Sequence, residues 1–194
     1  LTEVVKITKQ GKDIAIQLKN GQTILSNLVL NSTYSNINTI LQNSNLPKLP
    51  LKHELTEMPL LEMPDELRKI GITIMDGPFF SIIPFPDKKL HTMHHVRYTP
   101  ITSSVDGGGS YQVNLSKGSN VIYMINDAQR YIPILKNAKY KGSLYETKTL
   151  LIINESSDAR PILFKKDYRM KNFHIVLGGK IDNIYDIVEE IQTT

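Results

Sequence analysis

The sequence predicts an α+β protein whose main sheet is largely antiparallel, and three observations support this prediction. Strand-like runs follow one another along most of the 194 residues, separated by gaps of turn length. Helical periodicity is confined to a few short segments, and the chain closes on a strand, a glycine turn and a helix. Because parallel neighbours need crossovers of a dozen or more residues, short gaps favour antiparallel pairing.

Composition is that of an ordinary globular chain, with 40% hydrophobic and 22% charged residues. No apolar run approaches the roughly 18 residues of a membrane span, so we expect no membrane association. The absence of cysteine excludes disulfides and thiolate sites and fits a reducing compartment, which favours a cytoplasmic location. The net charge of +4 is dispersed, so nucleic-acid binding is not indicated.

The first 42 residues combine a meander with a short apolar strand. Hairpin signals at Gln10-Gly11-Lys12 and Asn20-Gly21 separate three β-favouring runs. Leu28-Val29-Leu30 then predicts a strand buried on both faces, ending in Asn31-Ser32-Thr33-Tyr34 before a short helix to Leu41. Open α/β sheets place ligands at such strand ends.

The middle of the chain predicts the antiparallel sheet. A stretch rich in Asn, Ser and Pro, residues 42–50, suggests a crossing between domains. The expected strands of this sheet are 51–63, 71–75, 79–85 and 89–99, and further strands are expected at 144–153 and 161–165. A helix is predicted from Asn120 to about Leu135, bent or ended by Pro133.

Residues 101–119 are rich in Gly, Ser and Thr, and we expect a mobile loop there. Gly107-Gly108-Gly109-Ser110 also resembles an engineered linker. The sequence leaves open whether this loop is natural or engineered.

The closing segment is the most informative. Phe173 to Leu177 predicts a buried strand, Gly178-Gly179-Lys180 a turn, and residues 181–191 a helix. The predicted buried face of that helix comprises Ile181, Ile184, Tyr185, Val188 and Ile191. Adjacent glycines allow close backbone approach, and helix N-terminal N–H groups favour an anion or an electron-rich ring edge. The alternative is a tight connection that serves only the fold.

Histidines and arginines supply the other candidates. If 89–99 is one strand, His91, His95 and Arg97 share a face opposite His94 and Tyr98, so three histidines do not converge and no metal site is predicted. Arg97 suits a bidentate grip on a carboxylate, with Tyr98 as a further donor. Arg160, before a predicted strand, is a similar candidate. The alternative is a solvated arginine paired with a local acid.

Common catalytic signatures are absent: the sequence contains no Gly-x-Ser-x-Gly, phosphate-binding loop, His-Glu-x-x-His or Gly-x-Gly-x-x-Gly. An enzyme with so few candidate nucleophiles would need a cofactor to carry its chemistry.

Several segments in order resemble flavin-dependent oxidoreductases of the amino-acid oxidase and glycine oxidase superfamily. They are Asn31 to Tyr34, His94-His95-Val96-Arg97-Tyr98-Thr99-Pro100, Arg160 to Phe164, and Gly178-Gly179-Lys180-Ile181-Asp182 with the residues to Asp186. The resemblance spans nearly the whole chain and corresponds to the latter two-thirds of family members.

The resemblance implies an organisation into flavin and substrate domains. Residues 1–42 and 156–194 would belong to a flavin-binding α/β domain, and residues 43–155 to a substrate domain with a large antiparallel sheet. FAD would contact Thr33, Tyr34, Gly178, Gly179, Lys180, Ile181 and Asp182. A small anionic substrate would contact His95, Arg97, Tyr98 and Arg160.

Two departures from the family pattern are visible. Ser32-Thr33-Tyr34 stands where the family has alanine-threonine-glycine, and the family's initial strand and glycine-rich turn are missing. Since that turn cradles the pyrophosphate, the chain resembles a fragment or an edited form of a family member, and we expect that it holds FAD weakly and is inactive alone. The sequence leaves open whether an N-terminal segment has been removed.

The resulting hypothesis is part of a FAD-dependent oxidoreductase that oxidises a C–N or C–O bond by hydride transfer to flavin. The alternative is a non-catalytic binding module for a sugar or a protein partner. The sequence gives no substrate identity, electron acceptor or oligomeric state.

Overall fold

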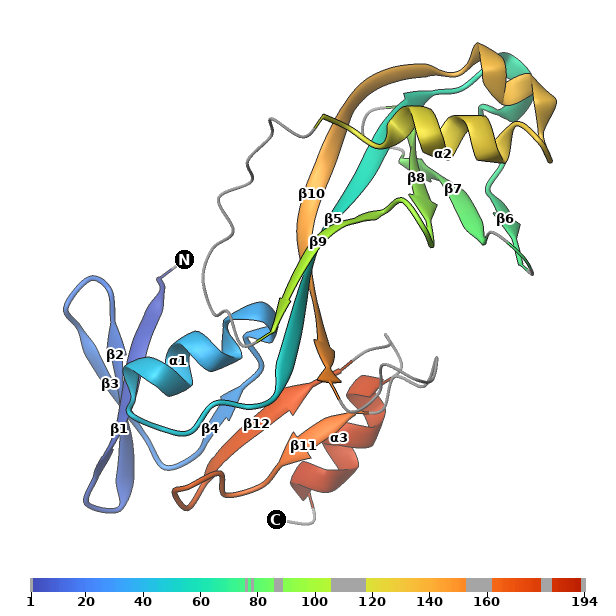
Figure 1. Cartoon of the computed structure of the whole chain (residues 1–194). Coiled ribbons are helices and arrows are strands. Elements are labelled where there is room, and N and C mark those ends of the chain that lie inside the picture. Colours follow the sequence, from blue (N-terminus) through green and yellow to red (C-terminus); the bar gives the residue numbers. More distant parts are fainter. Residues whose placement is uncertain are drawn as a thin grey trace. The chain divides into compact units, whose positions relative to one another are not determined.

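The α+β prediction is confirmed by the structure, a computed structural model that describes residues 2–75, 77, 79–85, 89–105, 118–152, 162–178 and 183–192 (Figure 1). These residues form two compact units. The first contains the described residues of Leu1–His53, Ser104–Ser110 and Thr149–Thr194. The second contains those of Glu54–Ser103 and Tyr111–Lys148. None of the described helices is long and apolar enough to cross a membrane.

The first unit begins with the predicted meander. Strands β1 (Val4–Gln10), β2 (Asp13–Leu18) and β3 (Thr23–Ser26) pair antiparallel in sequence order. Gly11 and Gly21 take positive φ values of 59° and 86° in the connecting turns, which a side chain would strain.

A second sheet in this unit has the order β11 (Leu163–Lys165), β12 (Phe173–Leu177), β4 (Val29–Asn31). Strand β12 runs antiparallel to β11 and parallel to β4. A 3₁₀ turn (Tyr34–Asn36) leads from β4 into α1 (Ile37–Asn43). Buried residues of α1, β12 and the meander share one core, which includes Ile7, Ile14, Ile37, Leu41, Phe173 and Ile175.

The expectation of two-face burial at residues 28–30 is wrong. Leu28 is 45% exposed and Leu30 39% exposed, although both are apolar. The reason is the position of β4, whose only partner among the described strands is β12. Val29 packs against the core and Asn31 is buried, whereas Leu30 points to the other face.

The large sheet has the order β10-β5-β8-β7-β6, with β9 also paired to β5. Its strands are β5 (Leu51–Glu62), β6 (Ile72–Ile74), β7 (Phe80–Phe85), β8 (Leu90–His95), β9 (Pro100–Val105) and β10 (Lys139–Leu151). Both β5 and β10 run from one unit into the other. A short 3₁₀ turn (Asp65–Leu67) follows β5.

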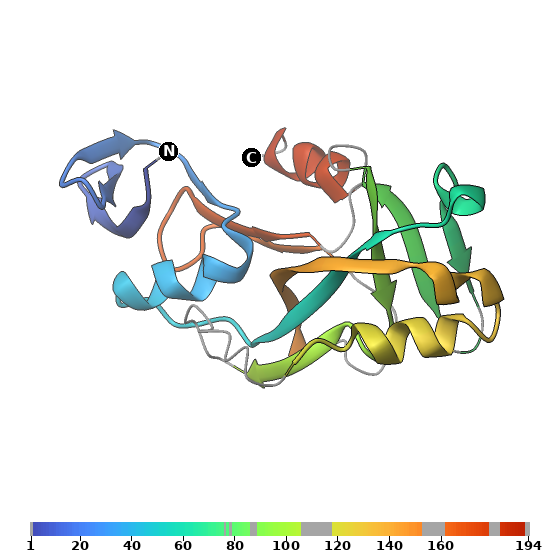
Figure 2. The ribbon, with the colours of Figure 1, turned by 90° about the horizontal axis from the view of Figure 1, so that it is seen from above.

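Helix α2 (Val121–Ala128) packs on strands of this sheet in the second unit, beside which it lies in both views (Figures 1 and 2). Met124 and Ala128 of α2 are buried with Phe80, Ile82 and Met93 of the strands. The helix is shorter than predicted: it ends at Ala128, where the Arg130 and Tyr131 N–H groups bond to the carbonyls three residues earlier, those of Asp127 and Ala128. Pro133 begins a separate 3₁₀ turn (Pro133–Asn137).

Two other boundaries differ from expectation. The predicted strand 89–99 ends at His95, where the chain turns. The predicted loop 101–119 begins as strand β9, because residues 101–105 pair with β5; residues 106–117, including the Gly-Gly-Gly-Ser segment, lie outside the described residues.

Helix α3 (Asn183–Gln192) is present as predicted, but two residues of its predicted apolar face are exposed. Ile187 is only 7% exposed, whereas Tyr185 is 74% and Val188 45% exposed. The covered stripe therefore follows Ile187 and the half-buried Ile191, four residues apart, and Tyr185 and Val188 flank it.

A buried carboxylate attaches α2 to the sheet. Glu57 of β5 is 0% exposed. Its carboxylate accepts hydrogen bonds from the Ser119 hydroxyl, from the Ser143 hydroxyl at 2.6 Å and from the Asn120 N–H at 2.8 Å. These donors are neutral, so the charge is stabilised by hydrogen bonds at the start of a helix.

We expect Glu57→Gln to lower the free energy of unfolding by about 1–3 kcal/mol, because an amide has one accepting oxygen and cannot accept all the hydrogen bonds that the buried carboxylate accepts with two. Urea unfolding measures this change. The matched control is Glu62→Gln on the same strand, a half-exposed site paired with Lys139 and Lys141, where we expect a loss of less than about 1 kcal/mol. Equal losses in the two variants would contradict the assigned role of Glu57.

Candidate functional site

The predicted site residues fall into both compact units and are described for each unit separately. Thr33, Tyr34 and Gly178 belong to the first unit, and His95, Arg97 and Tyr98 to the second. Arg160, Gly179, Lys180, Ile181 and Asp182 lie outside the described residues.

In the first unit, the C-terminal end of β4 forms a polar turn. The side-chain oxygen of Asn31 accepts from the Thr33 hydroxyl at 2.7 Å and from the Thr33 N–H at 3.2 Å. Asn31 is 4% exposed, and its buried Nδ2 has no hydrogen-bond partner among the described residues. An unpaired buried donor costs about 1–3 kcal/mol, so this amide is suited to an acceptor supplied from outside the chain.

Tyr34 follows this turn in an unusual backbone conformation. Its φ of 55° lies in the left-handed region, which costs a non-glycine residue roughly 1–2 kcal/mol. Its hydroxyl accepts a hydrogen bond from the Thr149 N–H at 3.1 Å, which holds the side chain in place. Such outliers concentrate at functional sites.

Because β12 and β4 are parallel, their C-terminal ends lie at the same end of the sheet. Asn31 is in parallel register with Ile175, and β12 continues for two residues to Leu177, before Gly178. Helix α3 begins at Asn183, so the predicted order of strand and helix is present. Ligands of open α/β sheets bind beyond the carboxyl ends of parallel strands, which is where Thr33, Tyr34 and Gly178 lie.

In the second unit, Arg97 and Tyr98 lie on a turn after β8. The Tyr98 and Thr99 N–H groups donate to the His95 carbonyl at 3.2 and 2.9 Å, and the Thr99 hydroxyl accepts from the His95 N–H at 2.8 Å. Arg97 is exposed on this turn and therefore does not share a strand face with His95.

The turn is also attached to the start of α2. The Asn120 side-chain amide donates to the Tyr98 carbonyl at 2.9 Å, and the Tyr98 ring stacks with Tyr123 at a centroid distance of 5.8 Å. The sheet contributes as well, since the Glu57 N–H donates to the Thr99 carbonyl at 2.8 Å. The backbone that presents Arg97 is thus held from several directions.

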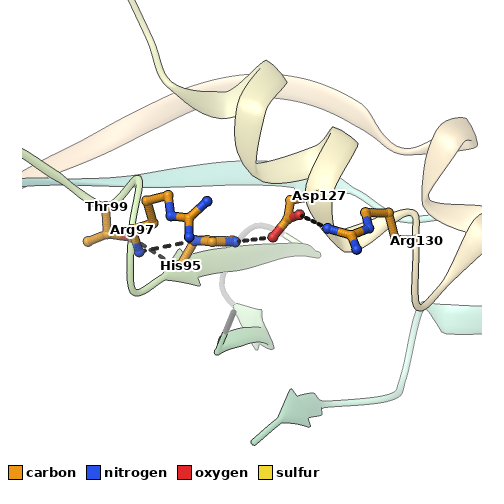
Figure 3. Close-up of polar contacts among 5 residues, drawn as sticks. All are labelled: His95, Arg97, Thr99, Asp127 and Arg130. Atoms are coloured by element: carbon orange, nitrogen blue, oxygen red, sulfur yellow. Dashed lines mark hydrogen bonds and ion pairs between the residues drawn. The ribbon is translucent and has the colours of Figure 1, made fainter. Parts of the chain in front are cut away.

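His95 lies beneath this turn and is 0% exposed. Its Nε2 is 3.0 Å from the Asp127 carboxylate of α2, whose other oxygen accepts from Arg130 at 3.1 Å (Figure 3). The Phe80 ring stacks with the imidazole at a centroid distance of 6.3 Å and an interplanar angle of 6°, and the Tyr98 ring centroid lies 4.7 Å from that of the imidazole. The hydrogen bond from His95 holds the pKa of Asp127 below its ordinary value, against the opposing effect of burial, and Arg130 adds to the lowering.

Metal-ligand groups do not assemble in the part of the chain that the structure describes: no three His, Cys, Asp or Glu side chains gather there. As strand alternation predicts, His91 and His95 are buried and His94 is exposed. Burial lowers the pKa of His91.

No protein-family model matches the sequence, and neither does any curated protein. Solved structures do match. They include glycine oxidase from Geobacillus kaustophilus, with a TM-score of 0.61 at 16% identity over 94% of this chain and 44% of that one. L-amino acid deaminase from Proteus vulgaris matches with a TM-score of 0.58 at 11% identity over 90% of this chain and 39% of that one. NikD, an unusual amino acid oxidase, matches with a TM-score of 0.61 at 8% identity over 93% of this chain and 47% of that one.

These matches show that the chain has the fold of part of amino-acid-oxidase-like flavoenzymes, and they confirm the resemblance at the level of fold. The chain spans less than half the length of each of these structures.

Sequence patterns did not identify Asp127 as a site residue. It lies 32 residues from His95, and its only local signal is its spacing of three residues from Arg130 on the helix. Asn31 was visible as a polar residue at a strand end, but its unpaired amide was not.

The lowered pKa of Asp127 predicts a pH-dependent contribution to stability. Because the folded-state pKa lies below the ordinary 3.8, ionised Asp127 stabilises the fold above that value, and the contribution is lost as the pH falls through the folded-state pKa. In urea unfolding, Asp127→Asn should therefore differ from the parent chain most at neutral pH and least in acid. The exposed Asp65→Asn is the control, and a gap that widened in acid would contradict the expectation.

Proposed function

We propose that the chain is part of a FAD-dependent oxidoreductase, located in the cytoplasm, that oxidises a C–N or C–O bond of a small anionic substrate. The observation that carries the proposal is the flavoenzyme fold over 94% of the chain. Since the chain covers 44% of the matched glycine oxidase, activity is assigned to the complete enzyme, and this chain alone is expected to be inactive.

The end of β4 and β12 fits a flavin in two respects. Within the part of the chain that the structure describes, the Asn31 Nδ2 is a buried donor without a partner, and Tyr34 has a strained φ just after the end of β4, where ligands of such sheets bind. Thr33, Tyr34, Gly178, Gly179, Lys180, Ile181 and Asp182 are the residues assigned to the cofactor. When bound, flavin would accept the hydride from the substrate carbon bonded to N or O, while that N–H or O–H loses a proton.

Arg97 is the residue assigned to the anionic group of the substrate. It is exposed, and among the described residues no carboxylate pairs with its guanidinium, whereas Arg68 and Arg130 each pair with an aspartate. An unpaired guanidinium on a well-held turn suits a bidentate contact with a carboxylate, and Tyr98 adds a hydroxyl. Arg160 is proposed for the same role on sequence alone.

The glycine turn provides the test of the flavin assignment. In the enzyme that contains this chain, Gly179→Val should lower bound flavin per folded protein far more than helix content, because a β-branched side chain blocks close approach. Flavin absorbance and circular dichroism measure the two quantities. A colourless parent enzyme that binds a glycan or a protein would instead support a non-catalytic binding module.

Arg97→Lys should weaken binding of a carboxylate substrate or analogue by about 1.5–3 kcal/mol, because lysine keeps the charge but loses the planar fork. Calorimetric titration of the enzyme measures this affinity. Arg68→Lys, which alters an exposed arginine paired with Asp65, is the control and should leave the affinity unchanged. Equal affinities of the Arg97→Lys and parent proteins for the carboxylate would contradict a substrate-binding role and support the alternative of a solvated surface arginine.

A further inference from the structure

We infer that His95 is a positioning residue, a neutral imidazole that fixes the shape of the turn presenting Arg97 and Tyr98. The inference rests on the proposed function only in assigning the substrate anion to Arg97. Its structural part stands on the hydrogen bonds of His95 itself.

Four hydrogen bonds of the turn converge on His95, and one of them depends on its side chain. Three involve its backbone, with Tyr98 and twice with Thr99, as described above. In the fourth, the Arg97 N–H donates to the imidazole Nδ1 at 3.2 Å (Figure 3). The ring therefore holds the backbone of the residue whose guanidinium faces solvent.

The tautomer of the ring follows from this contact. A backbone N–H can only donate, so Nδ1 must accept and carries no proton. In the neutral imidazole, the proton is then on Nε2, which donates to the Asp127 carboxylate at 3.0 Å. Asp127 thereby selects the tautomer that leaves Nδ1 free to accept from Arg97, as carboxylates do for functional histidines in other proteins.

Packing prevents the ring from rotating out of this arrangement. The imidazole is fully buried, stacked with Phe80 and tilted against Tyr98. Asp127 is in turn held by Arg130. With the turn fixed before binding, Arg97 loses less conformational freedom when it captures an anion, and this raises affinity without a new contact.

Two matched substitutions separate the two ring nitrogens. The amide oxygen of His95→Asn lies near the place of Nδ1 and can accept from the Arg97 N–H, but the side chain does not reach Asp127. The longer His95→Gln places an amide N–H₂ near Nε2 and leaves nothing in the place of Nδ1. Both variants lose the aromatic ring, so their losses of stability should be similar.

The measurements are the hydrogen-exchange rate of the Arg97 amide and the affinity for acetate, the carboxylate probe, both followed by NMR on the folded chain. We expect His95→Gln to speed exchange and to weaken acetate binding, each about fivefold, the value of one neutral hydrogen bond. His95→Asn should change each less than about twofold. Equal effects of the two substitutions on the Arg97 amide would overturn the inference.

A measurement on the unchanged protein covers the case in which neither variant folds. The ¹⁵N shifts of the His95 ring should show a protonated Nε2 and an unprotonated Nδ1, and the opposite tautomer would overturn the inference. A different result would contradict only the proposed function. In that case acetate affinity is the same in the parent protein and in Arg97→Lys, while the His95 tautomer and the exchange rate of the Arg97 amide are as expected.

Discussion

Strand β5 is the constraint on which the rest of this structure depends. Most of its 12 residues are buried, and it pairs with the consecutive strands β8 and β9 and with β10, which lies much later in the sequence. Leu51 at its start belongs to the core of the first unit, and Leu61 near its end belongs to that of the second. Because it is covered on both faces, its polar residues need partners inside the protein, and Glu57 finds them in backbone and hydroxyl donors near α2.

A carboxylate attaches helix α2 to the sheet at each end. One carboxylate belongs to the sheet and the other to the helix. Glu57 reaches from the sheet to the helix N-terminus, where the helix dipole favours a negative charge. Asp127 reaches from the last turn of the helix back to His95 of β8. A carboxylate near a helix C-terminus is disfavoured by the dipole, and Arg130 together with the His95 imidazole Nε2–H compensates for this. The turn carrying Arg97 contacts both attachments, because Thr99 bonds to the backbone of Glu57 and the Arg97 N–H bonds to the His95 ring.

Local rules predicted much of the fold, and long-range contacts decided the rest. Glycine turns defined the meander, and alternation placed His91 and His95 inside and His94 outside. The β-favouring residues Val96 and Tyr98 predicted a strand to Thr99, but the Thr99 hydroxyl closes a turn onto His95 instead. The partners of Glu57 lie 62, 63 and 86 residues away, and Asp127 lies 32 residues from His95, so spacing along the sequence carried no signal for either network. Burial at Leu28 and Leu30 depends on neighbouring strands, which one segment cannot specify.

Among the described strands, β4 is paired on one side only, and this has a practical consequence for work with this protein in solution. A strand at the edge of a sheet offers unpaired N–H and C=O groups to any other extended chain, and the exposed Leu28 and Leu30 add apolar area to that contact. Sheet edges of this kind promote self-association, which grows with protein concentration. Dilution opposes such edge-to-edge pairing, and so does Leu30→Lys, which places on this strand a charge that natural edge strands often carry.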